Sequence, residues 1–257
     1  MAERRNWSQE EVRHALALYL VTDFGRFHSR NPDIIDLAFR IDRTPSAVAL
    51  KLSNLAALDE SLPQKGMANA SNMDRQVWAE FLANPDGVLK AWEHQTMPPP
   101  ATTSPANSFP GLAEPATEFA FTGAGERRAE TTQRIGQGFF RKIILTSYRE
   151  RCALTGIEDT RLLNASHIVA WKDDPKNRIN PANGICLNAL HDRAFDRHLI
   201  TFDEDYKMKI ADHVPAVARR ELERVETGKL EMPSRFLPDQ AFLERHRREF
   251  FNKEISL

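Results

Sequence analysis

The sequence has few cysteines and no long apolar run, and each shortage excludes a class of protein. Only two of the 257 residues are cysteines, Cys152 and Cys186. Two are too few for a four-cysteine zinc site, and thiols in a cytosolic chain are more often reduced than paired. No apolar run approaches the roughly 18 residues needed to span a membrane, and the first residues, MAERRNWSQEE, lack the apolar core of a secretory signal. We therefore expect a cytoplasmic protein with no membrane partner.

A strong net charge is also missing, so overall charge gives no indication of a nucleic-acid partner. The formal net charge is −1. Residues 1–94 hold 11 Lys and Arg against 13 Asp and Glu, whereas residues 132–257 hold 22 against 19. A weak positive bias lies in the C-terminal half, although ordinary scatter would also explain a difference of this size.

A change in composition divides the chain. Residues 95–131 contain six prolines mixed with Thr, Ser, Ala and Gly, which is typical of an extended linker. Helical patterns precede this stretch, and a mixture of strand and helix patterns follows it. We predict an α+β protein with a helical N-terminal domain over residues 1–94, a proline-rich linker over 95–131 and a C-terminal domain over 132–257. In the last domain, helices are expected from Thr132, over Val214–Glu226 and after Asp239.

The N-terminal half shows three helix starts. Ser8 with Glu11 forms a capping-box pattern, Pro32 follows Asn31, and Thr44 precedes Pro45. Further helices are predicted near 73–84 and 87–94, after a loop over 62–72.

These three helices resemble the Myb/SANT-like helix-turn-helix group. The residues that carry the resemblance are Trp7-Ser8, Glu10-Glu11, Ile41, Arg43-Thr44, Ala47-Val48 and Lys51-Leu52. The resemblance implies that the third helix enters the DNA major groove. Its polar face would then present to phosphates or base edges Arg43, Ser46, Lys51, Ser53 and Asn54. The alternative is a helical bundle that binds a protein or only packs.

A second pattern lies between Cys152 and Phe202. His167 sits in an apolar run typical of a strand, and Asn183-Gly184 precedes a second short strand with Ile185 and Leu187. A helix-like segment follows, with His191, Asp192, Phe195 and Asp196. Two strands and one helix can bring an imidazole opposite carboxylates, which is the geometry needed to activate a water and hold a metal at a phosphate.

This ordered set resembles the HNH endonucleases, whose fold is the ββα-metal finger, and it is most similar to their bacterial restriction-type branch. The resemblance covers roughly residues 132–205. It is carried by Gly136-Gln137, Phe140-Arg141, Cys152, Thr155-Gly156, Ser166-His167-Ile168, Trp171, Asn183-Gly184, Leu187, His191-Asp192 and Phe195-Asp196. It implies a cytoplasmic, metal-dependent endonuclease that hydrolyses DNA, in a restriction or defence role and in some members only on modified DNA.

The resemblance also implies site residues. His167 matches the general base, and Asn183 matches the residue that holds the loop against the catalytic strand. The helix ligand falls on Asp192, with His191 and Asp196 as further candidates for binding a divalent metal, Mg²⁺ or Mn²⁺ before softer ions. Many relatives carry Asp or His immediately before the base, where this chain has Ser166.

Three arginines near this pattern, Arg178, Arg193 and Arg197, are candidate phosphate clamps, with ordinary surface arginines as the alternative. Two other functions stay open at this point. One is a non-enzymatic DNA-binding regulator that keeps the finger as a scaffold. The other is a nuclease effector whose N-terminal half binds a protein or a small signal. A homodimer is also left open.

Overall fold

The computed structural model describes residues 5–62, 69–96 and 124–255. Most of the predicted linker and part of the predicted 62–72 loop, namely 97–123 and 63–68, lie outside the described residues. The N-terminal elements are α1 (Gln9–Leu20), η1 (Phe24–Arg26), α2 (Pro32–Arg40), α3 (Pro45–Ala56), α4 (Asn72–Ala83) and α5 (Asp86–Thr96). The C-terminal elements are α6 (Ala124–Ser147), β1 (Leu163–His167), η2 (Pro175–Asn177), η3 (Pro181–Asn183), β2 (Gly184–Asn188), α7 (Ala189–Asp196), β3 (Ile200–Phe202), β4 (Met208–Ile210), α8 (Ala216–Leu222) and α9 (Gln240–Ile255). The predicted α+β class is confirmed.

The N-terminal helices begin where their capping residues predict. Ser8 and Glu11 form a reciprocal capping box at the start of α1. Pro32 occupies the first turn of α2, and the Thr44 side chain accepts a hydrogen bond from the Ala47 amide at the start of α3. Each cap satisfies backbone donors that a helix start otherwise leaves unpaired.

The helices on either side extend into the range predicted as a linker. α5 continues through Thr96, and α6 begins at Ala124 rather than Thr132. The prolines end at Pro115, and the residues after Gly125 are mainly helix formers such as Glu, Arg and Ala, which explains the earlier start of α6.

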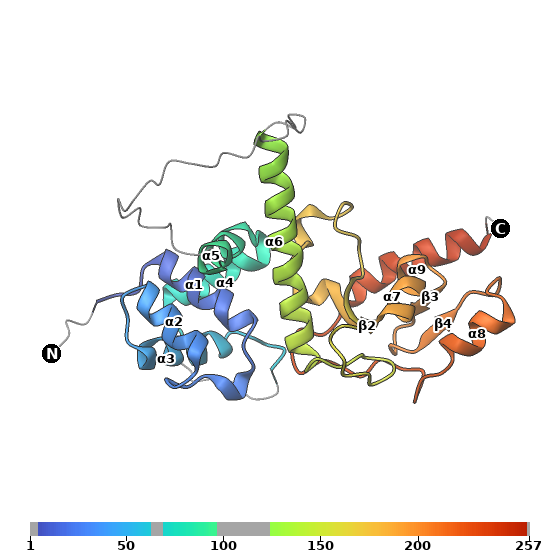
Figure 1. Cartoon of the computed structure of the whole chain (residues 1–257), viewed down its shortest axis with the longest axis horizontal. Helices are drawn as coiled ribbons and strands as arrows, with labels where there is room; N and C mark the ends of the chain where they lie inside the picture. The colour runs from blue at the N-terminus through green and yellow to red at the C-terminus, as the bar shows by residue number, and fades with distance from the viewer. Residues whose placement is uncertain (1–4, 63–68, 97–123, 256–257) are drawn as a thin grey trace, which may run out of the picture.

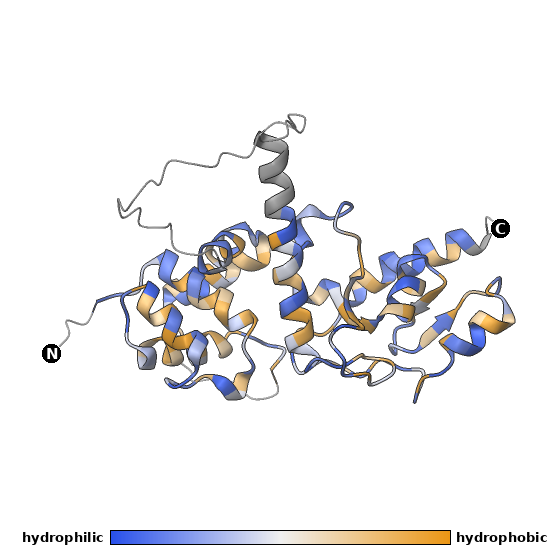
Figure 2. Ribbon diagram, in the orientation of Figure 1, coloured by the Kyte–Doolittle hydropathy of each residue, from blue (hydrophilic) through white to orange (hydrophobic). Residues whose placement is uncertain are grey.

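The two halves of the chain are in contact along α6, which runs between the N-terminal helices and the C-terminal elements (Figure 1). Trp92 on α5 stacks on Phe139 on α6, with ring centroids 4.8 Å apart. Arg235, buried in the C-terminal half, donates hydrogen bonds to the carbonyls of Tyr19 and Leu20. Apolar residues concentrate where these elements face one another (Figure 2), and one continuous apolar core includes residues of both halves.

The predicted strand–strand–helix order is present in the C-terminal half. β1 pairs antiparallel with β2, in a register that places His167 opposite Gly184 and Leu163 opposite Asn188. The connection over 168–183 contains η2 and η3, so Asn183-Gly184 leads into β2 and does not form a tight hairpin turn.

The elements after α7 differ from the prediction in two places. The β3–β4 hairpin has no counterpart in the sequence patterns we used. α8 spans only Ala216–Leu222, shorter at both ends than the expected Val214–Glu226, and its later start follows from Pro215, which restricts the residue before it and stands at the N-cap. The cap of the last helix is confirmed, since the Asp239 carboxylate accepts from the Ala241 amide.

Over the described ranges, none of the helices has both the length and the apolar character required to cross a bilayer.

Candidate active site

The frame of the site is the β1–β2 pair with α7, packed against α6. The Asn188 side chain caps α7 by accepting from the Leu190 and His191 amides. Gly184 on β2 lies close to α6, because a Cβ at this position would lie 2.5 Å from Ile144 Cδ1 and 2.6 Å from Phe140 Cζ. A side chain there would therefore push β2 away from α6.

His167 is held at the end of β1 in a defined orientation. Its ring stacks on Phe140 at 3.8 Å between centroids and meets Trp171 edge-on at 5.6 Å. Its Nε2 lies 2.9 Å from the Arg178 carbonyl. A carbonyl oxygen only accepts, so Nε2 carries the hydrogen and Nδ1 keeps its lone pair.

Burial lowers the pKa of His167, and the hydrogen bond to the Arg178 carbonyl offsets part of this effect. The imidazole is therefore neutral at neutral pH. A neutral ring with a free lone pair on Nδ1 is the form that a general base requires.

Asn183 holds the segment that follows His167. Its Oδ1 accepts from the Val169 amide at 2.8 Å, and its Nδ2 donates to the carbonyls of Val169 and Asn177. The side chain is fully buried. Asn183 thus contacts backbone groups and positions the loop beside the base.

Asp192 faces β1 from α7. Its two oxygens accept from Ser166 Oγ at 2.5 Å and from Asn164 Nδ2 at 2.7 Å. Asp196 lies one turn further on the same helix. Burial, and then the charge of Asp192, raise the pKa of Asp196, so α7 presents two carboxylates that repel each other.

His191 faces the core and not these carboxylates. The side chain is buried, with Nδ1 3.1 Å from Asn188 Oδ1 and Nε2 3.1 Å from the Leu222 carbonyl. Both ring nitrogens point at protein oxygens, so the structure contradicts His191 as a metal ligand. The reason is the helical period, which turns His191 inward together with the buried Phe195.

A cavity of about 420 Å³ brings His167 and Asp196 together. Its lining also includes Asp173, His198, Arg245, His246 and Glu249. None of these five was predicted as a site residue, because they lie in the 168–183 connection, after α7 or on α9, at no spacing that indicates a common site. A cavity of about 520 Å³ between the N-terminal half and α6 contains no predicted site residue.

Residues 152–203 match the protein-family model described as HNH endonuclease. The chain therefore carries an HNH endonuclease domain, and this domain supports phosphodiester hydrolase activity. A comparison with curated proteins found no match. The match leaves the N-terminal half uncovered, and the comparisons give no support to its Myb/SANT-like resemblance.

HNH nucleases typically use a divalent metal, and the donor set in this HNH domain fits one in part. Asp192 and Asp196 supply hard oxygen donors of the kind that Mg²⁺ and Mn²⁺ prefer. Across the described part of the chain, no group of three or more His, Cys, Asp and Glu side chains is arranged to hold a metal ion. The fit is therefore to a cation with few protein ligands.

The three candidate phosphate clamps lie around the HNH domain. Arg193 on α7 and Arg197 at its C-cap are exposed, and their charges offset part of the rise in the pKa of Asp196. The Arg178 guanidinium lies over the Trp171 ring at 5.3 Å, and its Nε donates to the Pro175 carbonyl. All three are close to the candidate site, while contact with phosphate stays a prediction.

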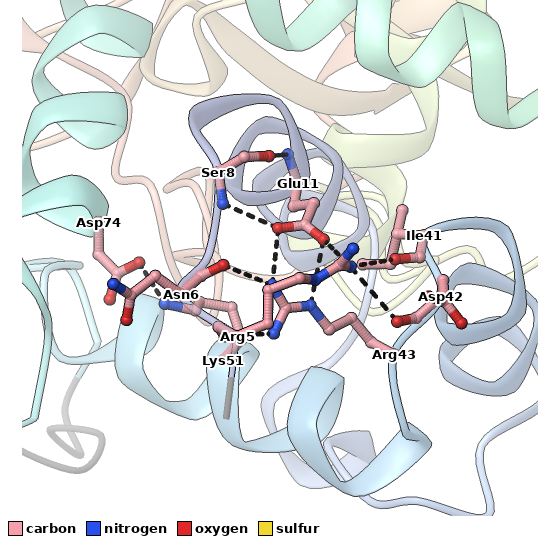
Figure 3. Close-up of polar contacts among 9 residues, drawn as sticks. All are labelled: Arg5, Asn6, Ser8, Glu11, Ile41, Asp42, Arg43, Lys51 and Asp74. Carbon is pink, nitrogen blue, oxygen red and sulfur yellow. Dashed lines mark hydrogen bonds and ion pairs between the residues drawn. The ribbon is translucent and has the colours of Figure 1, made fainter. Parts of the chain in front are cut away.

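The predicted DNA-reading face of α3 is only partly exposed. Lys51 is buried, and its Nζ lies 2.6 Å from Asp74 Oδ1, so the prediction that Lys51 is presented to DNA is wrong (Figure 3). Arg43 donates to Glu11 and to the carbonyls of Arg5 and Asn6.

Both cations lie 4.8 Å from the centroid of the Trp7 ring. Through these contacts, Arg43 and Lys51 connect Arg5 and Asn6 with α1, α3 and α4. Of the remaining candidates, Ser46 is exposed and Asn54 is half-buried.

Proposed function

We propose that this protein is a metal-dependent HNH endonuclease that hydrolyses DNA, in a bacterial restriction or defence role. The observation that carries the proposal is the state of His167, whose Nδ1 lone pair is free in a ring fixed by Phe140, Trp171 and the Arg178 carbonyl. Asp196 lines the same cavity, so a base and a carboxylate adjoin one space.

His167 takes the proton in the proposed reaction. The oxygen of a water attacks phosphorus, the proton of that water passes to Nδ1 of His167, and the bond from phosphorus to the 3′ oxygen breaks. A bound divalent cation supplies neutralisation of the phosphate charge. Asp192 and Asp196 would hold it, and Ser166 and Asn164 fix the direction of the Asp192 carboxylate.

Digestion of DNA by the full-length protein tests this proposal. Methylated and unmethylated plasmids would be incubated with Mg²⁺, Mn²⁺ or EDTA, because the resemblance leaves dependence on base modification open. We expect cutting that needs a divalent cation, at roughly millimolar concentration for a site with few carboxylates.

His167→Ala would be compared with His213→Ala, which changes an exposed histidine away from the cavity. Loss of the base should lower the rate by about 10² to 10⁴, while the control keeps the wild-type rate. Equal rates for the two variants would refute the assignment of His167.

A non-enzymatic DNA-binding regulator is the weaker alternative. It predicts DNA binding without cleavage under every metal condition. A regulator that only binds DNA does not require a neutral imidazole whose Nδ1 keeps its lone pair, which is why we favour the enzyme.

The N-terminal half supplies selectivity in this proposal, by binding either DNA or a protein. Against DNA, Lys51 and Arg43 are occupied by internal contacts. In favour of a protein, α2 exposes Phe39 and Ile35 one turn apart, with Phe39 87% exposed.

The test measures the DNA affinity of full-length His167→Ala with and without the added substitutions Ser46→Ala and Asn54→Ala. A lower affinity in the triple variant supports DNA recognition by the N-terminal half. Unchanged affinity favours the protein-binding alternative.

We further propose that the chain consists of a helical N-terminal domain, a proline-rich linker and a C-terminal nuclease domain, with the linker lying between Thr96 and Ala124. Limited proteolysis should cut first within 97–123, where the prolines are concentrated. The two fragments should stay associated on a sizing column, because Trp92–Phe139 stacking and the Arg235 hydrogen bonds join them. A homodimer and a cytoplasmic location also stay proposals. Light scattering of the full-length protein tests the dimer.

A further inference from the structure

Part of the cavity around His167 is supplied by α9, which lies beyond the family match. The match ends at residue 203, and α9 begins at Gln240. α9 contributes Arg245, His246 and Glu249 to the cavity lining. The ββα elements alone therefore do not enclose the candidate active site.

The charges around this cavity are unbalanced. Its lining contains three carboxylates, Asp173, Asp196 and Glu249, and the only arginine or lysine among the described lining residues is Arg245. A phosphodiester anion in this space would be repelled by the carboxylates. A cation must therefore offset them, and Arg245 is the permanent one available from the chain.

The contacts that hold Arg245 use only part of its hydrogen-bonding capacity. Its Nη2 donates to the Asp173 carbonyl at 3.2 Å, and its Nη1 lies 3.7 Å from Asp174 Oδ2, which is too long for a hydrogen bond. The side chain is 46% exposed. A guanidinium has five N–H donors, so most of them are free to meet an anion.

The neighbouring arginines of α9 differ. Arg247 is only 13% exposed and donates to the Phe202 carbonyl and to Gln240 Oε1, which gives it a structural role. Arg248 is exposed but does not line the cavity. Arg248 is therefore a matched control for Arg245.

α9 is fixed relative to the rest of the site by His246. This buried ring stacks on Phe195 at 3.8 Å, its Nε2 donates to the Phe195 carbonyl and its Nδ1 accepts from Thr201 Oγ1. Phe195 immediately precedes Asp196. The part of α9 that carries Arg245 is thus fixed next to the cavity that Asp196 also lines before any substrate binds, as electrostatic stabilisation of a transition state requires.

We propose that Arg245 is a catalytic residue that binds the scissile phosphate in the His167 cavity. Its free N–H groups donate to the non-bridging oxygens of the phosphate, and its charge stabilises the negative charge that grows as water adds to phosphorus and the 3′ oxygen leaves. This inference rests on the proposed nuclease function.

The test compares full-length Arg245→Ala, Arg245→Lys and Arg248→Ala with the wild type. Cleavage rates would be measured in single turnover at saturating DNA with Mg²⁺, and DNA affinity by fluorescence anisotropy in EDTA. We expect Arg245→Ala to lower the maximal rate by about 10² to 10³, with affinity changed only a few-fold. Arg245→Lys should keep part of the rate, and Arg248→Ala should keep nearly all of it.

Chemical rescue separates contact with the phosphate from a structural role. Added guanidinium ion at concentrations that leave the protein folded should raise the rate of Arg245→Ala but not that of His167→Ala. A wild-type rate in Arg245→Ala, or a loss with neither rescue nor partial activity in the lysine variant, overturns the inference. If the wild type cuts no DNA, the proposed nuclease function itself fails. If it cuts and Arg245→Ala cuts equally well, only the role of Arg245 fails.

Discussion

The hydroxyl of Ser166 donates a hydrogen bond to the carboxylate of Asp192, with 2.5 Å between Oγ and Oδ1. This contact joins the residue before the proposed base to the candidate metal ligand on α7. Ser166 stands at the position where many HNH relatives carry an ionisable residue, Asp or His. On the β1 side, the carboxylate of the candidate metal ligand Asp192 is therefore held by two neutral hydrogen-bond donors, Ser166 and Asn164.

Ser166→Asp should exchange stability for metal affinity. The new carboxylate would face Asp192 at a buried position, so we expect a loss of about 1–3 kcal/mol of unfolding free energy in EDTA. Binding of Mg²⁺ by the folded state alone should recover this loss, and the Mg²⁺ concentration at half-maximal cleavage should fall. Thermal melts with and without Mg²⁺, and a metal titration of cleavage, measure both effects. Ser29→Asp, at an exposed serine between η1 and α2, is the control. A melt that Mg²⁺ does not shift would place the cation elsewhere.

His191→Ala should affect stability and leave the metal requirement unchanged. The buried ring contacts Asn188 Oδ1 and the Leu222 carbonyl, so its removal leaves a cavity and takes a hydrogen-bond partner from the Leu222 carbonyl. We expect the free energy of unfolding, measured with urea, to fall by about 1–3 kcal/mol. The Mg²⁺ titration of cleavage should match the wild type, whereas Asp192→Asn should require more Mg²⁺ or be inactive. The opposite pattern would restore His191 as a ligand.

Acid should destabilise the protein through its buried and half-buried histidines. Burial is the largest cause that lowers the pKa of His246, to about 3, and burial also lowers the pKa values of His167, His191 and His198. Below the ordinary histidine pKa of about 6.5, the unfolded chain binds protons that the folded chain does not. Stability is therefore complete above pH 6.5 and is lost as pH falls, for His246 down to about pH 3.

The slope of this loss can be measured with urea at several pH values. Each such histidine contributes at most about 1.4 kcal/mol per pH unit. Replacing His246 with Asn should lower the stability at pH 7.5 but make its decline toward pH 5 shallower by about this amount. His213→Ala, at an exposed position, should leave the slope unchanged. An unaltered slope in His246→Asn would mean that the ring does not stay neutral in the folded state.

The order of the HNH elements and the residues on them could be predicted from the sequence, because each depends on local chemistry. The capping box of Ser8 and Glu11, the strand around His167 and the helix with Asp192 are all short-range patterns. The orientation of His191 was left open between the core and the metal. The helical period places His191 on the face of Phe195, and the partner of its Nε2, the Leu222 carbonyl at the end of α8, lies 31 positions away.

The rest of the site depends on contacts distant in the sequence. Arg245 reaches the cavity because His246 packs on Phe195, a contact that no periodicity encodes. The error at Lys51 has a similar origin. A lysine on a short helix is usually exposed, and only the position of Asp74 on α4 makes burial of this one favourable.

The buried pair of Lys51 and Asp74 tests whether α3 reads DNA through Lys51. The two side chains are 5% and 0% exposed, with 2.6 Å between Nζ and Oδ1. Lys51→Ala leaves the Asp74 charge buried without its partner, so we expect a loss of about 3–5 kcal/mol of unfolding free energy. Replacing both, as Lys51→Met with Asp74→Leu, should recover much of that loss, because an apolar pair avoids the cost of burying charge. DNA affinity of the double variant, measured at a temperature where it is folded, should equal that of the wild type. A double variant that is stable but binds DNA at least tenfold more weakly would show that Lys51 leaves its ion pair to contact DNA.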